Sequence, residues 1–265
     1  MLGLGLGITG VRGLWSPARL FSAGSQGLFL DPSILSSMSQ DTAGATPVTG
    51  PGQPVGRAMD RSGRGNHATQ ATAAQRPTYQ VDGSGRPYLY FDGVDDGMLT
   101  SSVAWGSGEV TVIAAMRKRS DAALGFVLEL TTSWSVSAGF AMTAPGNTGG
   151  QATYSFRANG SGVVGIAETP ASYAAPVTSI VTGQGRIATD TNRIRVNGGS
   201  WVTQAADQGT GNYATAPLYI GARNSDQLRA SIDLYGLIAI NRVLTDAELS
   251  RVERYFANRI GVTLA

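Results

Sequence analysis

Residues 60–70 read DRSGRGNHATQ, and residues 85–96 read GRPYLYFDGVDD. The first stretch places glycine, serine and asparagine directly after an aspartate, which is typical of a tight turn in which Asp60 accepts backbone N–H bonds. His67 then starts a strand and has a structural hydrogen-bonding role in this interpretation. The second stretch contains a Tyr- and Phe-rich run at 88–92 that ends at a glycine, as a short strand does. Both stretches predict short strands separated by turns.

The same pattern continues along the rest of the chain. Runs rich in Val, Ile, Tyr, Phe and Thr, bounded by Gly, Asn, Asp and Pro, occur at 110–117, 124–131, 152–157, 177–182, 192–197, 217–221 and 232–240. Short strands at this spacing, with no helical period between them, predict an all-β sandwich or barrel. Asn197-Gly198 is the sharpest hairpin signal, because both residues tolerate positive φ.

One helix is expected, at residues 245–260. Thr245 and Glu248 form a capping box, and Gly261 stands where a C-terminal cap belongs. Apolar residues recur at helical spacing on one face, at Leu249, Val252, Tyr255, Phe256 and Ile260. This stripe predicts a helix that packs against a sheet.

The N-terminal region has a different character. Glycines alternate with four apolar residues, Leu2, Leu4, Leu6 and Ile8. Period-two alternation places these side chains on one face of an extended strand. Residues 1–27 therefore form either a fraying terminus or, as we favour, an extended assembly arm that adds to a neighbouring subunit. A loop-rich segment at 28–54 leads into the sandwich, which is predicted over 55–265.

Composition excludes several classes of protein. The chain has no cysteine, so disulfides and thiolate metal sites are absent. Net charge is +2, and charged residues make up 14% of the chain, a low share that suits a protein packed against others. The densest basic cluster, Arg117-Lys118-Arg119, contains the only lysine and is interpreted as the solvated end of a strand. Nucleic acid is not an expected partner. No apolar run suggests membrane insertion or a signal peptide.

Catalytic patterns are also missing. The single histidine, His67, has no Gly-x-Ser-x-Gly motif to work with. Glycoside hydrolases need two carboxylates on one face, and Glu109, Glu129 and Glu168 occur singly. We therefore expect no enzymatic activity.

Three segments together resemble laminin-G-like, concanavalin A-like domains. They are residues 60–70, which match D-x-S-G-x-G-N-H-A-T, residues 85–96, and the strand-to-helix ending at 240–248. The resemblance covers about 55–263 and implies a two-sheet antiparallel jelly-roll sandwich, usually non-enzymatic, that often binds glycans or proteins and sometimes holds calcium at its rim.

Residues 22–33 extend the resemblance to a tailed-bacteriophage subset of that family, whose members are decoration, tail or fibre-associated proteins. The resemblance thus implies a virion structural protein, located in the virion, whose partners are other virion proteins or its own copies. The alternative is a carbohydrate-binding lectin that adheres to host surface glycans. A glycan hydrolase is the least favoured interpretation.

Two sets of residues are candidates for binding. Aromatic side chains in or beside Gly-, Ser- and Asn-rich loops can stack on sugar rings, although core packing is the alternative for each of them; they are Trp134, Tyr173, Trp201 and Tyr213. Asp92, Asp95 and Asp96 lie within five residues around a glycine, so they could offer oxygen ligands to calcium or could cap the turn. No other cofactor is expected.

Overall fold

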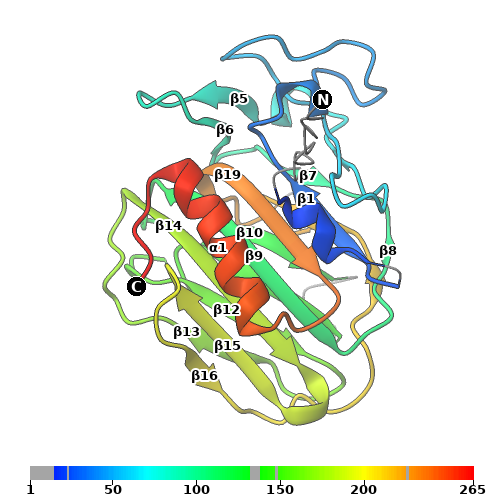
Figure 1. Cartoon of the computed structure of the whole chain (residues 1–265), viewed down its shortest axis with the longest axis vertical. Coiled ribbons are helices and arrows are strands. Elements are labelled where there is room, and N and C mark those ends of the chain that lie inside the picture. Colours follow the sequence, from blue (N-terminus) through cyan, green and yellow to red (C-terminus); the bar gives the residue numbers. More distant parts are fainter. Residues whose placement is uncertain (1–14, 23, 132–137, 147–148, 225–226) are drawn as a thin grey trace, which may run out of the picture.

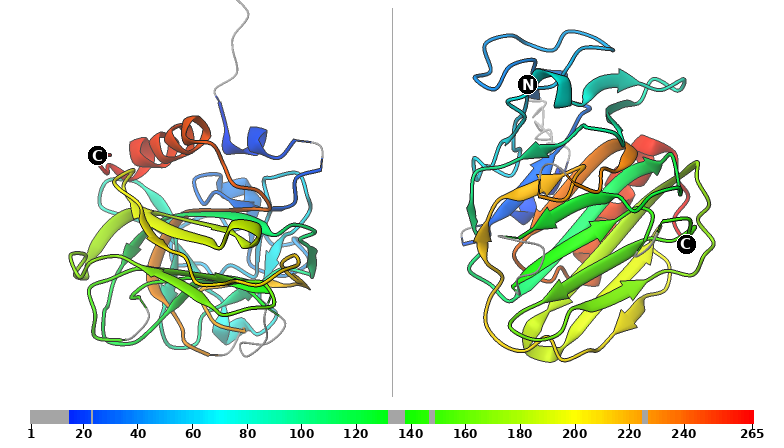
Figure 2. Two further views of the ribbon diagram at one scale, coloured as in Figure 1. Left: turned by 90° about the horizontal axis from the view of Figure 1, so that it is seen from below. Right: turned by 180° about the vertical axis from the view of Figure 1, so that it is seen from behind.

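The computed structural model describes residues 15–22, 24–131, 138–146, 149–224 and 227–265. Within these residues two antiparallel sheets pack face to face (Figure 1). Helix α1 (Asp246–Ile260) lies on the outer face of one sheet only, which we term the covered sheet, as Figure 2 (left) shows. The other is termed the open sheet. The fold is a jelly-roll sandwich with one C-terminal helix, as the sequence predicts.

The covered sheet has the strand order β16–β15–β14–β9–β19–β6–β5, and β1 also pairs with β19. Its strands are β16 (Val202–Gln204), β15 (Thr191–Val196), β14 (Val177–Arg186), β9 (Glu109–Lys118), β19 (Ser231–Ile240), β6 (Pro87–Asp92), β5 (Thr78–Val81) and β1 (Gly27–Leu30).

The open sheet has the order β13–β12–β11–β10–β18–β7–β4–β3–β2. Its strands are β13 (Gly165–Glu168), β12 (Ser155–Asn159), β11 (Gly139–Thr143), β10 (Phe126–Leu130), β18 (Leu218–Ile220), β7 (Met98–Leu99), β4 (Ala68–Thr69), β3 (Arg57–Ala58) and β2 (Met38–Ser39). Outside the two sheets lie the pair β8 (Val103–Ala104) and β17 (Thr215–Ala216) and the short 3-10 helices η1 (Pro17–Leu20), η2 (Leu35–Ser37), η3 (Ala73–Gln75) and η4 (Ile187–Thr189).

The side chains of β9 explain how the layers form. Val110, Val112 and Met116 point into the core between the sheets, whereas Ile113 and Ala115 point toward the helix layer. A strand with both faces buried reads as a nearly continuous apolar run, as 110–116 does.

Helix α1 begins and ends as the sequence predicts. The Thr245 side chain accepts from the Glu248 N–H, the Glu248 carboxylate accepts from the Thr245 N–H, and Gly261 caps the other end with a φ of 69°. Leu249, Val252, Phe256 and Ile260 are buried in a cluster with apolar residues of the covered sheet. Among the polar residues on this face, Glu253 is buried and pairs with Arg195, whose Nη2 lies 2.8 Å from its carboxylate.

The turn at 60–67 confirms the predicted role of its aspartate. Asp60 Oδ1 accepts from the N–H groups of Ser62 (2.8 Å) and Phe29 (3.0 Å), and Oδ2 accepts from that of Asn66 (3.0 Å). The Asp60 N–H itself donates to Nδ1 of His67 at 3.0 Å. Because Phe29 belongs to β1, this turn also anchors the first strand.

The chain joins the sandwich earlier than the sequence suggests. Strand β1 pairs with β19 from Gly27 to Leu30 and is fully buried, and β2 joins the open sheet. Residues 28–54 thus contribute strands to both sheets, whereas the sandwich was expected to begin at residue 55. The predicted assembly arm, with Leu2, Leu4, Leu6 and Ile8, lies outside the described residues.

Lys118 corrects the interpretation of the basic triplet. Alternate residues of β9 point between the two sheets, and Lys118 is the next residue of this series after Met116. Its side chain therefore enters the space between the sheets, where it is fully buried. Nζ lies 2.6 Å from Asp121 Oδ1, donates to the Thr153 carbonyl at 3.2 Å, and lies 4.7 Å from the centre of the Tyr154 ring. Strand alternation overrides the preference of a lysine for water because these partners compensate its charge.

Candidate functional site

The outer face of the open sheet carries a cluster of polar and charged side chains, several of which are buried. Helix α1 and η1 pack on the covered sheet, and no helix of the described residues lies over the opposite side (Figure 2, left). A small cavity of about 60 Å³ opens on this face. Its lining includes Glu129, Thr131, Asn159, Arg157 and Arg223. We term these residues, with Tyr219, the open-face cluster.

Strand register assembles the cluster from distant parts of the chain. Glu129 on β10 is opposite Tyr219 on β18 and, on its other side, opposite Ala141 of β11. Ala141 is in turn opposite Arg157 of β12. Directly paired residues share one face of a sheet, so the carboxylate, the phenol ring and the guanidinium form one row across the open face.

The centre of the cluster is a buried carboxylate. Glu129 is 5% exposed, and burial raises the pKa of its carboxyl above the ordinary value, against the opposing effect of Arg223. Glu129 Oε1 lies 3.7 Å from Arg223 Nε, and Oε2 accepts from the Asn224 N–H at 3.1 Å. This network holds the glutamate in one position on the face.

Two arginines flank the carboxylate and share an aromatic support. The guanidinium carbons of Arg157 and Arg223 lie 5.4 Å and 5.2 Å from the centre of the Phe126 ring. Burial lowers the pKa of both arginines, but a guanidinium stays charged at neutral pH. Charged donors and acceptors held side by side suit the recognition of a neutral polar ligand with several hydroxyl groups.

A second carboxylate lies on the same face of the open sheet. The other strand carboxylate on it, Glu168, is on β13, and register places it opposite Ser155 rather than Arg157. Three strand spacings separate β13 from β10, a backbone distance of roughly 14 Å. Both carboxylates act on the same arginine, because Glu129 and Glu168 each oppose the lowering of the Arg157 pKa.

Trp201, one of the predicted aromatic residues, is on the opposite side of the sandwich. It packs against the helix layer of the covered sheet and is half-buried. The guanidinium carbons of Arg193 and Arg195 lie 4.3 Å and 4.5 Å from the centre of its ring. Two cation–π contacts orient this indole, so its position is part of a structural stack. Trp134 lies outside the described residues.

The two predicted tyrosines lie elsewhere. Tyr173 is half-buried and packs on Tyr154 with ring centres 5.5 Å apart. Tyr213 is only 3% exposed and meets Phe140 edge to face at 5.2 Å. Its ring is part of the core between the sheets and is not available at the surface. Tyr173, Trp201 and Tyr213 therefore do not share one surface.

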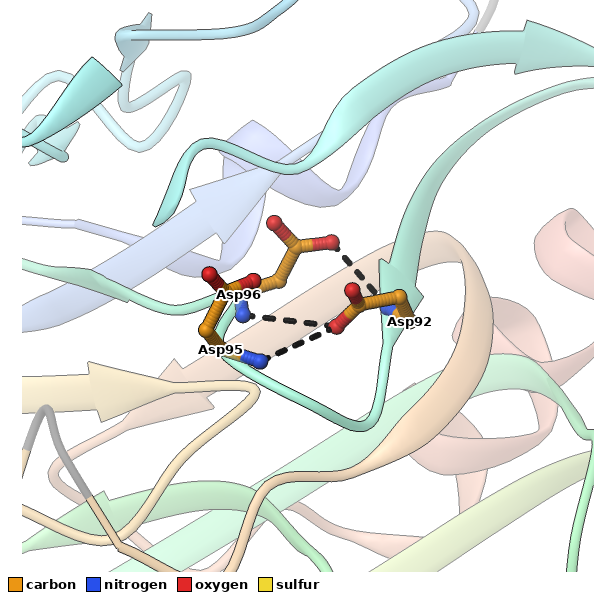
Figure 3. Close-up of side chains that lie close together, drawn as sticks. All are labelled: Asp92, Asp95 and Asp96. Carbon is orange, nitrogen blue, oxygen red and sulfur yellow. Dashed lines mark hydrogen bonds between the residues drawn. The ribbon is translucent and has the colours of Figure 1, made fainter. Parts of the chain in front are cut away.

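The three aspartates of the β6 turn do come together (Figure 3). One possible ligand atom from each of Asp92, Asp95 and Asp96 lies within 4.8 Å of the others. Asp92 Oδ1 also accepts from the N–H groups of Val94 (2.7 Å), Asp95 (3.2 Å) and Asp96 (3.4 Å), and Asp96 Oδ2 accepts from the Asp92 N–H at 3.0 Å. The oxygen donors fit a hard cation such as calcium. The turn itself already uses two of the carboxylates.

Comparisons with known proteins identify the fold. No protein-family model matches the sequence, and no curated protein matches it. Among solved structures, the chain resembles Trypanosoma rangeli sialidase, with 15% identity and a TM-score of 0.54 over 89% of this chain and 33% of that one. It also resembles the receptor binding domain of botulinum neurotoxin D, with 10% identity and a TM-score of 0.57 over 87% of this chain and 52% of that one.

A third similar structure is the binding domain of botulinum neurotoxin DC in complex with SialylT, at 9% identity and a TM-score of 0.54, over 75% of this chain and 48% of that one. The chain thus spans between a third and about half of the length of these proteins. The similarity shows a shared β-sandwich fold, and nothing in the comparisons points to a bacteriophage. In the described residues, no helix has the length and apolar character needed to cross a membrane.

Proposed function

We propose that the chain is a non-enzymatic, carbohydrate-binding module that holds a neutral glycan on its open face. The observation that carries this proposal is the row formed by Tyr219, Glu129 and Arg157 across four neighbouring strands of the open sheet. An aromatic ring beside fixed donors and acceptors suits a sugar, since one face of a sugar ring is apolar and its edges carry hydroxyls.

An ion pair and a hydrogen bond preorganise the centre of the proposed site. Glu129 is nearly inaccessible and is fixed by Arg223 and the Asn224 N–H, so a ligand does not need to order it. Preorganised groups lose little entropy on binding. Tyr219 is half-buried and can offer part of its ring. Support also comes from two proteins of similar fold, a receptor binding domain and a binding domain in complex with SialylT.

The test is a glycan array followed by calorimetry on the best neutral ligand. Glu129→Gln preserves the shape of the side chain and removes its charge, and Tyr219→Ala removes the ring. We expect each variant to bind at least about tenfold more weakly, because a hydrogen bond to a charged group contributes about 1.5–3 kcal/mol. Circular dichroism checks that both variants fold.

Trp201→Ala is the matched control, since this aromatic residue is on the covered-sheet side. We expect it to bind like the unmodified protein. Loss of binding in Trp201→Ala alone would move the site to the helix side of the molecule. Folded Glu129→Gln and Tyr219→Ala proteins that bind every glycan normally would overturn the proposal.

The virion role is a second proposal, supported by the alternating leucines of residues 2–8 and by the sequence resemblance. In this proposal the N-terminal arm attaches the sandwich to other virion proteins or to its own copies. Deleting residues 1–14 should leave the sandwich folded and abolish its incorporation into particles. Full incorporation of the shortened protein would contradict the role of the arm.

A further inference from the structure

A second candidate surface lies on the other side of the molecule, along the outward side of α1. Trp15 lies across this helix and meets Tyr255 edge to face, with ring centres 6.1 Å apart. Depressions of about 320 Å³ and 400 Å³ border Trp15, and both also include Tyr255 and Asn258. We term the two depressions together the Trp15 groove. Their size is that of a site for a small ligand.

The groove is strongly positive. Its charged lining consists of one carboxylate, Asp31, and four arginines, Arg61, Arg251, Arg254 and Arg259. Four positive charges against one negative charge leave +3, whereas the whole chain carries +2. The lining of this groove therefore carries a higher net positive charge than the chain as a whole.

The one carboxylate in the groove already forms an ion pair with one of the four arginines. Asp31 is 4% exposed and accepts from Arg259 Nη1 at 2.7 Å and 2.8 Å. The Tyr255 hydroxyl donates to the same carboxylate at 2.7 Å. Arg259 also lies over the Tyr255 ring, 4.1 Å from its centre. These contacts fix the position of the Tyr255 ring beside the groove.

The remaining three arginines are free to meet a ligand. Arg61, Arg251 and Arg254 are exposed, and none of them forms an ion pair with another described residue. The acidic residues Glu248 and Glu253 of α1 are used elsewhere, in pairs with Arg242 and Arg195. Arg251 already lies 5.7 Å from the centre of the Trp15 ring, so guanidinium and indole present a joint surface.

We propose that the Trp15 groove binds an acidic glycan, a saccharide that carries carboxylate or sulfate groups. The free guanidinium groups supply paired donors for such anions. The exposed parts of Trp15 and Tyr255 supply a stacking surface for the sugar rings. Proteins that bind a nucleic-acid backbone commonly contact more phosphates than three arginines can reach. The groove has three free arginines and no lysine, so we do not assign it to nucleic acid. This site is on the covered side and does not depend on the open-face cluster.

The experiment measures binding of alginate oligosaccharides, which carry carboxylates, and of heparin oligosaccharides, which also carry sulfates. Calorimetry on the full chain at two salt concentrations gives the affinities, with neutral dextran as the uncharged reference. We expect Arg251→Gln/Arg254→Gln to bind at least about tenfold more weakly, since two charge-assisted contacts are lost. We expect Trp15→Ala to weaken binding in the same direction.

Arg57→Gln/Arg76→Gln is the matched control, because it removes the same charge from residues that bond to loop carbonyls away from α1. We expect its affinity to stay within about twofold of the unmodified value, and Glu129→Gln to have no effect. Equal losses in both double variants would show diffuse attraction and overturn the site. Tighter binding of single-stranded DNA or poly-glutamate of equal charge would overturn the glycan assignment, as would absence of binding to both acidic glycans.

Discussion

Lys118 is the only amine on a side chain of this protein, and it is fully buried between the sheets. Its Nζ contacts Asp121 and the Thr153 carbonyl, and burial lowers the pKa of the ammonium group. Reagent access, more than basicity, then limits its reactivity. We expect an amine-acylating reagent to modify only the α-amino group of the folded chain and to reach Lys118 only after unfolding. Peptide mass spectrometry measures this, and rapid acylation of Lys118 in the folded protein would show that the end of the sandwich opens.

Asp96 gives a pH dependence at the level of one carboxyl group. Burial, followed by the nearby Asp92 and Asp95 carboxylates, raises its pKa to about 6, against the hydrogen bond from the Asp92 N–H. The folded state therefore holds a proton that an unfolded aspartate, with a pKa of about 3.9, has already released. The stabilising contribution is complete below about pH 4 and is lost as pH rises through about 6.

Asp96→Asn should consequently raise the melting temperature at pH 7.5 and change it little at pH 4. The asparagine oxygen can still accept from the Asp92 N–H, so the turn is preserved. Asp95→Asn, at a more exposed position, is the matched control and should have the smaller effect. Melting curves with calcium and with a chelator test the metal interpretation. A rise in melting temperature that requires calcium and disappears in Asp96→Asn would contradict the turn-capping account and establish a cation site.

At the N-terminal end of α1, one side chain, Glu248, takes part in both the helix cap and an ion pair. Glu248 accepts from the Thr245 N–H and pairs with Arg242 at 2.8 Å, and mainly this arginine lowers the pKa of Glu248 to about 2. The stabilisation is present above about pH 4.5, the range of an unfolded glutamate, and is lost as pH falls toward 2. Glu248→Gln should thus be less stable than the unmodified protein at pH 7.

Chemical denaturation at pH 7 and pH 3 measures this difference, which we expect to shrink at the lower pH. Asp246→Asn is the control, because this second first-turn acid is exposed and forms no ion pair with a described residue. An equal loss of stability at both pH values in Glu248→Gln would show that the helix cap depends on shape and not on charge.

Elements encoded by neighbouring residues could be predicted from the sequence. Asn197 and Gly198 adopt φ values of 51° and 73° in the hairpin between β15 and β16, and α1 begins and ends at its predicted caps. The open-face cluster could not be predicted in this way. Glu129, Arg157 and Tyr219 meet only through the register of separate strands, and no local pattern specifies that register. The glutamate looked isolated because its partners are distant in sequence.

The two outer faces of the sandwich differ in the charged residues that they carry. The open face carries a buried carboxylate between two arginines, whereas the helix side has three arginines, Arg61, Arg251 and Arg254, that form no ion pair with a described residue. The sandwich separates the two surfaces, so a ligand on one need not exclude a ligand on the other. Binding at both faces would allow one copy of the protein to bridge two glycans, with the gain in avidity that linked sites provide.

Truncation of the N-terminal region tests where the folded part of the chain begins. Removing residues 1–14 leaves every described residue of the fold in place, so we expect unchanged stability. Removing residues 1–30 also deletes β1, whose Leu28, Phe29 and Leu30 are at most 1% exposed. Burying each such side chain contributes about 1.5–3 kcal/mol, and the three together rival the roughly 5–15 kcal/mol that stabilises a typical domain.

The longer deletion also exposes the edge of β19 from Leu237 to Ile240, which β1 covers. Unpaired apolar edges promote aggregation, so we expect the product lacking residues 1–30 to be unfolded or insoluble. Urea denaturation and size-exclusion chromatography of both products make the comparison. A stable, monomeric protein without β1 would show that the sandwich begins near residue 55 after all, and a large loss of stability on removing residues 1–14 alone would show that the first residues belong to the folded core.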